Sequence, residues 1–195
     1  MKVRRLPESA SSPHEKIEVL CVLGLGSNRP YKGLSCADII ITAAGDLRKI
    51  LSKLRLSPLY KTVPLYVEDQ EPFINAVAAG FFCIDKIAPN TGIAEAARSM
   101  LKIIQNLEAF YGRDRSLERR RGERSLDIDI LLFGDLVLAE DDLTVPHPGL
   151  KERAFALRPL LDLLPETQEP ATGKKYRGIL DALPFQEIVP LPELC

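Results

Sequence analysis

Residues 124–134 read Arg-Ser-Leu-Asp-Ile-Asp-Ile-Leu-Leu-Phe-Gly. Apolar and acidic residues alternate at the start of this stretch, which is the period of a β-strand whose successive side chains point to opposite faces. The strand would carry one apolar row and one largely acidic row, formed respectively by Leu126, Ile128 and Ile130 and by Asp127, Asp129 and Leu131. The stretch therefore predicts a strand with one side turned to a core and one acidic side.

The segments outside this strand predict an alternation of strands and helices. Apolar, β-branched runs bounded by turn residues predict further strands at residues 17–25, 55–60 and 73–84. Apolar residues that recur every three or four positions predict helices at residues 35–54 and 93–107. The order strand, helix, strand, strand, helix, strand is that of an α+β, ferredoxin-like (βαββαβ) domain. Such a domain has a mainly antiparallel sheet with helices on one face.

The length of 195 residues favours one domain with tails. Residues 1–15 combine proline, serine and charge without periodicity, so we expect a flexible N-terminal extension. We expect residues 16–184 to form a single domain and residues 185–195 to form a C-terminal tail. Within the domain, residues 61–72 and 112–124 predict two long loops, and loops of about a dozen residues are often functional.

Composition and charge argue against several classes of protein. The 26 Lys and Arg residues nearly balance the 27 Asp and Glu residues, so no global field points to nucleic acid or to a membrane surface. The longest apolar stretches, residues 19–25 and 76–84, are far shorter than the roughly 18 residues that a membrane-spanning helix needs. No apolar secretion signal is visible, and the four cysteines lie far apart without a CxxC pair. We therefore expect a cytoplasmic protein with reduced thiols and without a zinc site.

Asp127 and Asp129 are the first candidates for metal ligands. Aspartate is disfavoured in strands, yet these two lie on one face, with Cα atoms roughly 6.6 Å apart at a rise of about 3.3 Å per residue. Carboxylates at that spacing can converge on one or two Mg²⁺ ions. The competing interpretation is a solvated strand face that neighbouring arginines neutralise.

The loop that precedes the acidic strand is rich in arginine. Its six arginines are Arg113, Arg115, Arg119, Arg120, Arg121 and Arg124. Guanidinium groups bind phosphate oxygens in a bidentate manner, so the loop and the two aspartates together predict a polyphosphate site. Taken alone, such a loop is more often a solvated or nucleic-acid-binding segment. The chain has neither a P-loop nor the protein-kinase motifs, which excludes those two classes of phosphotransferase.

Five motifs, in this order, resemble the family of 6-hydroxymethyl-7,8-dihydropterin pyrophosphokinase (HPPK), an enzyme of the folate pathway. They are residues 25–28 (LGSN), 73–77 (FINAV), 112–113 (GR), 124–134 (RSLDIDILLFG) and 143–148 (LTVPHP). The resemblance extends from about residue 19 to residue 183, and the ferredoxin-like fold of the family matches the predicted order of elements.

The resemblance implies transfer of pyrophosphate from ATP to the hydroxymethyl oxygen of the pterin, with two Mg²⁺ ions and release of AMP. The residues matched to catalysis are Arg113, Arg124, Asp127 and Asp129, of which the two aspartates would hold the metal ions. Those matched to the nucleotide are Gln105, Glu108, Arg115, Ile130, Thr144, His147 and Arg153. Those matched to the pterin are Thr62, Leu65, Phe73, Asn75 and Phe155, with the two phenylalanines sandwiching the ring. The implied partners are the pterin and ATP, while fusion to or association with dihydropteroate synthase or another folate enzyme stays open.

Two alternative functions stay open as well. An RNA-binding module on the same fold would place the arginine loop on phosphates and sheet aromatics on bases. The acidic strand face, the 6% of aromatic residues and the near-neutral net charge argue against it. A catalytically silent partner in the folate pathway would have no need of the aspartates and arginines that this chain retains. The chain also has no tryptophan, unlike some members of the family, so the alignment of residues 116–123 is open.

Overall fold

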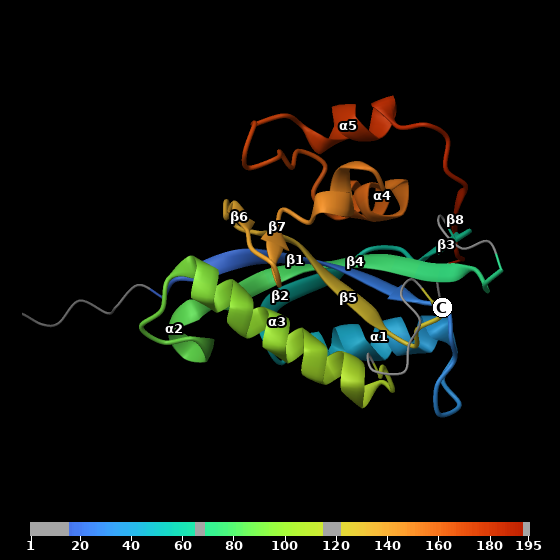
Figure 1. The fold of residues 1–195 in the computed structure, drawn as a ribbon, viewed down its shortest axis with the longest axis horizontal. Helices are drawn as coiled ribbons and strands as arrows, with labels where there is room; N and C mark the ends of the chain where they lie inside the picture. The colour runs from blue at the N-terminus through green and yellow to red at the C-terminus, as the bar shows by residue number, and fades with distance from the viewer. Residues whose placement is uncertain (1–15, 65–68, 115–121, 193–195) are drawn as a thin grey trace, which may run out of the picture.

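The computed structural model describes residues 16–64, 69–114 and 122–192 (Figure 1). The N-terminal extension proposed for residues 1–15 lies outside these ranges. The elements, in chain order, are β1 (Glu18–Ser27), α1 (Cys36–Leu47), β2 (Leu51–Leu56), β3 (Tyr60–Thr62), β4 (Phe73–Cys83), α2 (Ile84–Ile87), α3 (Ile93–Phe110), β5 (Asp127–Phe133), β6 (Leu138–Ala139), β7 (Thr144–Val145), the 3₁₀ helix η1 (Pro148–Lys151), α4 (Ala154–Leu163), α5 (Tyr176–Ala182) and β8 (Ile188–Pro190).

The main sheet is antiparallel at every strand pair in the described residues. Its strands follow the order β5, β1, β4, β3, β8, and β2 also pairs with β4. The predicted ferredoxin-like sheet is therefore confirmed, with β1 and β4 at its centre. Gly26 of β1 faces Asp127 of β5 on one side and Asn75 of β4 on the other. This register brings a predicted metal ligand and a predicted pterin ligand into one row across three strands.

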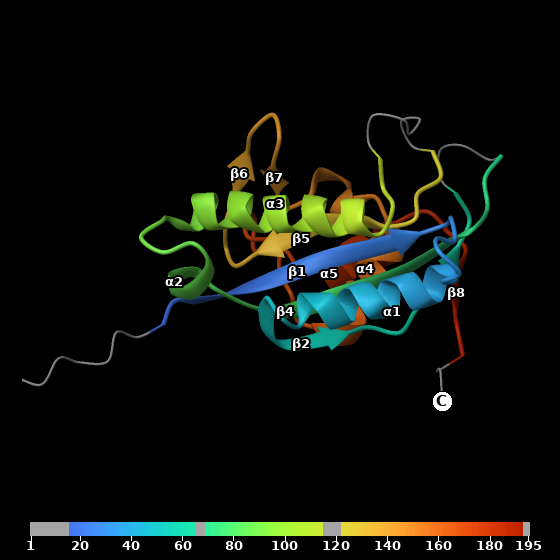
Figure 2. The same ribbon diagram turned by 90° about the horizontal axis from the view of Figure 1, so that it is seen from below.

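Helices cover both faces of this sheet, as Figures 1 and 2 show. The two helices of the βαββαβ core, α1 and α3, pack on one face around buried residues such as Leu23 and Met100. On the other face, α4 and α5 pack on Val22, Val77 and Leu131. The sequence analysis predicted helices on one face only. The second layer follows from the central strands, which are apolar on both faces and so need cover on both.

The first helix is shorter than predicted. It ends at Leu47 instead of continuing to residue 54, and β2 begins four residues later. Leu51 and Leu54 are both buried, although residues three apart in a regular strand point to opposite faces. A β-bulge in β2 shifts its register against β4 and turns both leucines to the core. Their spacing of three residues therefore imitated the helical period.

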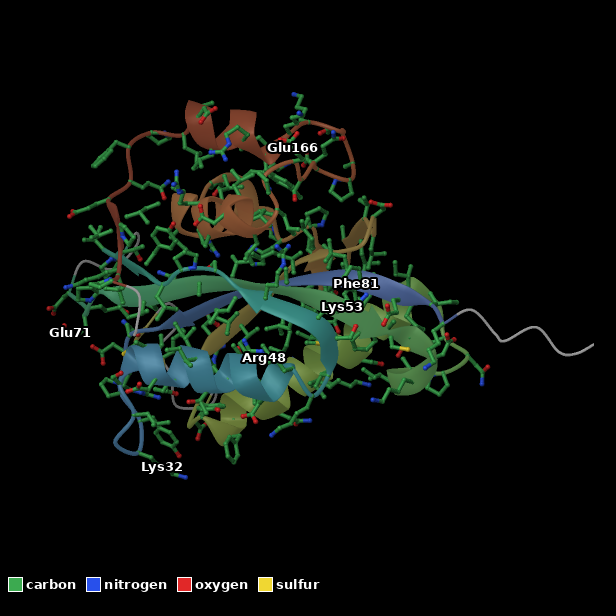
Figure 3. All side chains as sticks on the ribbon, turned by 180° about the vertical axis from the view of Figure 1, so that it is seen from behind. Lys32, Arg48, Lys53, Glu71, Phe81 and Glu166 are labelled. Carbon is green, nitrogen blue, oxygen red and sulfur yellow. The ribbon has the colours of Figure 1, made fainter. Side chains whose placement is uncertain are left out.

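Lys53 lies within this bulge and has a φ of 50°, in the left-handed region. Its ammonium group lies 5.9 Å from the centroid of the Phe81 ring on β4, and Figure 3 labels both residues. This arrangement is a cation–π contact on an exposed part of the sheet, away from the pocket described below.

The domain extends past the predicted boundary at residue 184. Residues 188–190, which the sequence analysis assigned to the tail, form β8 and pair with β3, so that Ile188 faces Thr62. Backbone hydrogen bonding along the sheet edge, rather than an apolar pattern, builds this short strand, which is why composition did not reveal it. In the part of the chain that the structure describes, no helix combines the length and apolar character needed to cross a membrane.

Candidate active site

A pocket of about 160 Å³ lies on the α4 side of the sheet. Gly24 and Gly26 of β1 contribute to its lining between β4 and β5. A Cβ atom on Gly26 would lie 3.1 Å from Oδ1 of Asn75, and one on Gly24 would lie 3.3 Å from the Leu131 side chain. The two glycines therefore keep the floor of the pocket at backbone level, because a side chain at either position would intrude into it.

The acidic end of the pocket carries Asp127 and Asp129, which share one face of β5 as the alternation predicted. Asp127 forms ion pairs with Arg124, at 2.6 Å, and with Arg113. Burial alone would raise the pKa of Asp127, but these two guanidinium groups outweigh it and lower that pKa below its usual value. Asp127 is therefore ionised, and two arginines of the predicted phosphate-binding loop already converge on it.

Asp129 lies in a different electrostatic environment. Its Oδ2 atom is 3.8 Å from Nη1 of Arg153 and 3.8 Å from Nε2 of His147. Burial, together with the negative charge of Asp127, raises the pKa of Asp129 to about 6. A cation bound beside Asp129 would therefore stabilise its ionised form and lower its pKa.

Glu108 on α3 is almost fully buried, at 1% exposure, and does not line the pocket. Its Oε1 atom accepts the backbone N–H of Ile128 at 2.9 Å and forms an ion pair with Arg113. Glu108 therefore fixes Arg113, which in turn contacts Asp127. A buried carboxylate between a backbone donor and an arginine is fully compensated, which explains how α3 can carry an acid in its core-facing side.

His147 precedes η1 and lines the pocket with its Nε2 atom toward Asp129. Its Nδ1 atom accepts the N–H of Gly149 at 3.1 Å, which places the proton of the neutral ring on Nε2. Burial and the nearby Arg153 charge lower the pKa of His147 to about 4. The side chain is thus a neutral hydrogen-bond donor directed at the acidic end of the pocket.

Aromatic and amide side chains line the pocket beside the acidic ones, since a Cβ atom on Gly26 would lie 3.9 Å from Cδ1 of Phe73 and 4.0 Å from Cβ of Asp127. Phe73 of β4 and Phe155 of α4 both line it, so two elements far apart in sequence supply the two rings. Asn75 is buried and donates from Nδ2 to Oγ1 of Thr62 at 2.7 Å. Two phenylalanines and one oriented amide are suited to a flat heterocycle with polar edges.

Several predicted site residues lie elsewhere. Gln105 is exposed on α3, and Thr144 on β7 directs its hydroxyl to the Glu140 carbonyl. Ile130 faces the core between the sheet and the α1–α3 layer, because strand alternation turns it away from Asp129. None of these three side chains lines the pocket. Leu65 and Arg115 lie outside the described residues.

Asn28, which the sequence analysis left without a role, connects the two long loops. Its Oδ1 atom accepts the N–H of Arg124 at 2.8 Å, and its Nδ2 atom donates to the carbonyl of Glu71 at 3.2 Å. The backbone N–H of Asn28 also donates to the Arg124 carbonyl at 3.0 Å. Figure 3 labels Glu71, which lies at one end of the molecule. The sequence does place an asparagine directly after a buried strand. A buried amide at that position needs hydrogen-bond partners, which other segments of the chain must supply.

Within the described residues, no cluster of three or more His, Cys, Asp or Glu side chains has the arrangement of a metal site. Asp127 and Asp129 are thus a pair of carboxylates that both line the pocket. This matches Mg²⁺, which is commonly bound through one or two carboxylates and completes its coordination with water and substrate phosphates.

Comparison with known proteins points to one family. The family described as 7,8-dihydro-6-hydroxymethylpterin-pyrophosphokinase (HPPK) matches residues 22–165. A Pseudomonas aeruginosa protein named 2-amino-4-hydroxy-6-hydroxymethyldihydropteridine pyrophosphokinase is 41% identical over 155 residues, which cover 78% of this chain and 87% of that protein. The folic acid synthesis protein fol1 of Schizosaccharomyces pombe is 36% identical over 185 residues, covering 94% of this chain but 23% of that protein.

Solved structures share the fold. A Plasmodium falciparum HPPK-DHPS triple mutant crystallised with STZ-DHP superposes with a TM-score of 0.62 at 17% identity, covering 87% of this chain and 44% of that chain. The wild-type P. falciparum HPPK-DHPS structure gives a TM-score of 0.59 at 17% identity, with coverage of 87% and 45%. The chain therefore spans less than half of these two-part proteins and about a quarter of the fission yeast one.

Proposed function

The chain belongs to the 7,8-dihydro-6-hydroxymethylpterin-pyrophosphokinase family, and on that premise we propose that it transfers pyrophosphate from ATP to 6-hydroxymethyl-7,8-dihydropterin. The products are the pterin pyrophosphate and AMP, and the reaction belongs to folate biosynthesis. The observation that carries the proposal is the composition of the pocket. Asp127 and Asp129 line it together with Phe73 and Phe155, so one cavity offers carboxylates for a metal bound to phosphates and rings for a heterocycle.

Asp127 and Asp129 are the proposed ligands of two Mg²⁺ ions. When bound, the ions neutralise the charge of the ATP phosphates and of the departing AMP oxygen. The donor set supports this assignment, because both carboxylates line the same pocket and carboxylate oxygens are ligands that Mg²⁺ takes in proteins.

The triphosphate is proposed to lie against Arg124, Arg153 and His147, which line the acidic end of the pocket. The arginines donate in fork geometry to phosphate oxygens, and the neutral His147 ring donates from Nε2. Arg113 joins them from the end of α3, where Glu108 holds it. These contacts position the phosphates and withdraw charge from them during transfer.

The pterin is proposed to stack between Phe73 and Phe155. Because Nδ2 of Asn75 is engaged by Thr62, its Oδ1 atom, which lies above Gly26, is available to accept an N–H of the pterin edge. In the reaction, the hydroxymethyl oxygen forms a bond to the β-phosphorus, the bond from that phosphorus to the oxygen bridging to the α-phosphorus breaks, and AMP departs with this oxygen. The hydroxyl proton is lost to water. The protein contributes by holding the two reactants in line, without a covalent intermediate of its own.

The remaining matched residues stay as proposals. Leu65 is assigned to the pterin and Gln105, Arg115, Ile130 and Thr144 to the nucleotide, while Glu108 acts through Arg113. The names of the relatives support a further proposal, because fusion of such a domain with a second folate enzyme occurs in the HPPK-DHPS structures and in the bifunctional folate synthesis proteins of Arabidopsis thaliana. We propose association of this chain with, or fusion to, dihydropteroate synthase.

The test is the fate of labelled phosphates. With ATP labelled separately at the α- and β-phosphates, in Mg²⁺ and in the presence of the pterin, the β-label should appear in the pterin product and the α-label in AMP. Omission of the pterin should abolish AMP formation. Formation of labelled ADP, or binding of both substrates without turnover, would refute the proposed reaction.

A further inference from the structure

The segment between α5 and β8 reaches the wall of the pocket from outside. The Gln186 side chain makes two hydrogen bonds to the backbone at the start of α4. Its Oε1 atom accepts the N–H of Ala154 at 2.9 Å, and its Nε2 atom donates to the carbonyl of Glu152 at 2.8 Å. The two bonds therefore lie on either side of Arg153, and one carboxamide fixes both peptide groups that flank this residue.

Arg153 and Phe155 depend on that backbone for their positions. Arg153 is the N-cap of α4, with no capping hydrogen bond from its own side chain, so the first N–H of the helix needs an outside partner. Its guanidinium group lies 3.8 Å from Asp129 and 5.8 Å from the centroid of the Phe155 ring. Phe155 is the second residue of the same helix and also lines the pocket.

The segment that follows Gln186 is attached to the edge of the sheet. In this segment, β8 pairs with β3, and the N–H of Leu191 donates to the Leu59 carbonyl at 2.8 Å. A second hollow on the outer side of the pocket is lined by Gln186 together with Thr62 and Phe155. The bond between Gln186 and α4 thus joins the edge of the sheet, where Thr62 orients Asn75, to the helix that carries Phe155.

We propose that Gln186 is a positioning residue for the pyrophosphate transfer. By fixing the backbone on both sides of Arg153, it sets the distance of the Arg153 guanidinium from Asp129 and the distance of the Phe155 ring from β4. Gln186 lies outside residues 22–165, to which the family match is confined. The inference rests on the proposed function and adds to it a residue from the segment that closes the sheet.

Gln186→Leu tests the proposal, since leucine keeps most of the volume and removes both hydrogen bonds. We expect the KM values for the pterin and for ATP each to rise about tenfold, with a smaller fall in kcat, because the loss of one or two hydrogen bonds affects the positions of both Arg153 and Phe155. In the ligand-free protein, hydrogen exchange at the Ala154 amide should accelerate at least about tenfold. Asp181→Asn, at an exposed position of α5, is the matched control and should leave all these quantities unchanged.

A residue with a merely structural role would lower the melting temperature and leave the KM values of the folded enzyme as in the wild type. That outcome for Gln186→Leu would overturn the proposal. Should Gln186→Leu not fold, Gln186→Glu decides the question, since it keeps the acceptor for Ala154 and loses the donor to Glu152. We expect from it about a threefold rise in both KM values, and unchanged values would equally overturn the proposal. An inactive wild-type enzyme with accelerated exchange in the variant would instead refute the proposed function and leave the backbone contact intact.

Discussion

Gly26 occupies a position in β1 where a single methyl group would approach Asn75 and Phe73 in the pocket. A Cβ atom there would lie 3.1 Å from Oδ1 of Asn75, the oxygen proposed to accept from the pterin. Gly26→Ala should therefore displace this oxygen and raise the KM for the pterin about tenfold, the equivalent of one hydrogen bond. Stability should change by less than about 1 kcal/mol, since only the end of one side chain moves.

Gly45→Ala is the matched control for this substitution. Gly45 lies in α1, and a Cβ atom at this position meets nothing within 4 Å. The alanine should stabilise the helix by up to about 1 kcal/mol and leave the KM unchanged. Steady-state kinetics and denaturant unfolding of the two variants separate the local effect on the pocket from a general effect of alanine. An unchanged KM in Gly26→Ala would contradict the proposed place of the pterin.

Asn28 gives a second prediction at the residue scale. Asn28→Leu removes the acceptor for Arg124 and the donor to Glu71, and leaves two partly buried backbone groups without partners. We expect a loss of about 2 to 4 kcal/mol in the free energy of unfolding. Limited proteolysis should cut faster near both residue 71 and residue 124, since the amide contacts both segments. Faster cleavage at only one of the two would contradict the role of Asn28 as their connection.

The sequence could reveal a site residue only where the neighbouring residues in the chain make it stand out. Asp127 and Asp129 stand out because two acids in one strand are locally unfavourable, and the structure places both in the pocket. The contacts of Asn28 with Arg124 and of Glu108 with Ile128 join residues 96 and 20 positions apart, so no local pattern encodes them. Ile130 is a different case, because its place in the motif suggests a contact with the nucleotide, which stays a proposal, while its side chain packs in the core and does not line the pocket.

At the scale of elements, the end of α3 sets the course of the arginine-rich loop. Gly112, with a φ of 86°, follows the helix, and a Cβ atom there would clash with the Tyr31 ring. Gly112→Ala should lower the free energy of unfolding by more than about 2 kcal/mol, combining backbone strain with this clash. It should also slow AMP formation, because Arg113 is the next residue and pairs with Asp127.

Gly173→Ala separates the two causes. Gly173 has a φ of 70°, but a Cβ atom there meets nothing within 4 Å. This variant should therefore show only backbone strain, about 1 to 2 kcal/mol, and a normal rate of AMP formation. Thermal unfolding and kinetics of both variants check this. Equal losses in the two variants would contradict the importance of the contact with Tyr31.

The elements themselves were predicted where one period dominates. The buried strands β1, β4 and β5 and the long helix α3 follow from runs of apolar residues at a single period. The region after α1 was wrongly predicted as helix up to residue 54, because the bulge in β2 gives Leu51 and Leu54 a spacing that belongs to helices. The strand β8 escaped prediction since pairing with β3 defines it and its own side chains are largely exposed.

At the scale of the whole molecule, the two helical layers have unequal parts in function. Leu157 of α4 and Met100 of α3 are both fully buried, on opposite faces of the sheet. Replacement of either by alanine should cost about 2 to 5 kcal/mol in the free energy of unfolding. Only Leu157→Ala should also raise the KM values, because α4 carries Phe155 and follows Arg153. Equal kinetic effects of the two variants would indicate that the pocket is not confined to one layer.

The two carboxylates of β5, Asp127 and Asp129, are proposed to serve pyrophosphate transfer. The most direct measurement compares pterin-dependent AMP formation in the wild type, in the double variant Asp127→Asn plus Asp129→Asn, and in the control Asp142→Asn, which changes an exposed aspartate away from the pocket. We predict that the double variant retains its fold by circular dichroism and loses activity by a factor of about a thousand or more. The control should match the wild type. A folded double variant that forms AMP at the wild-type rate would contradict the account.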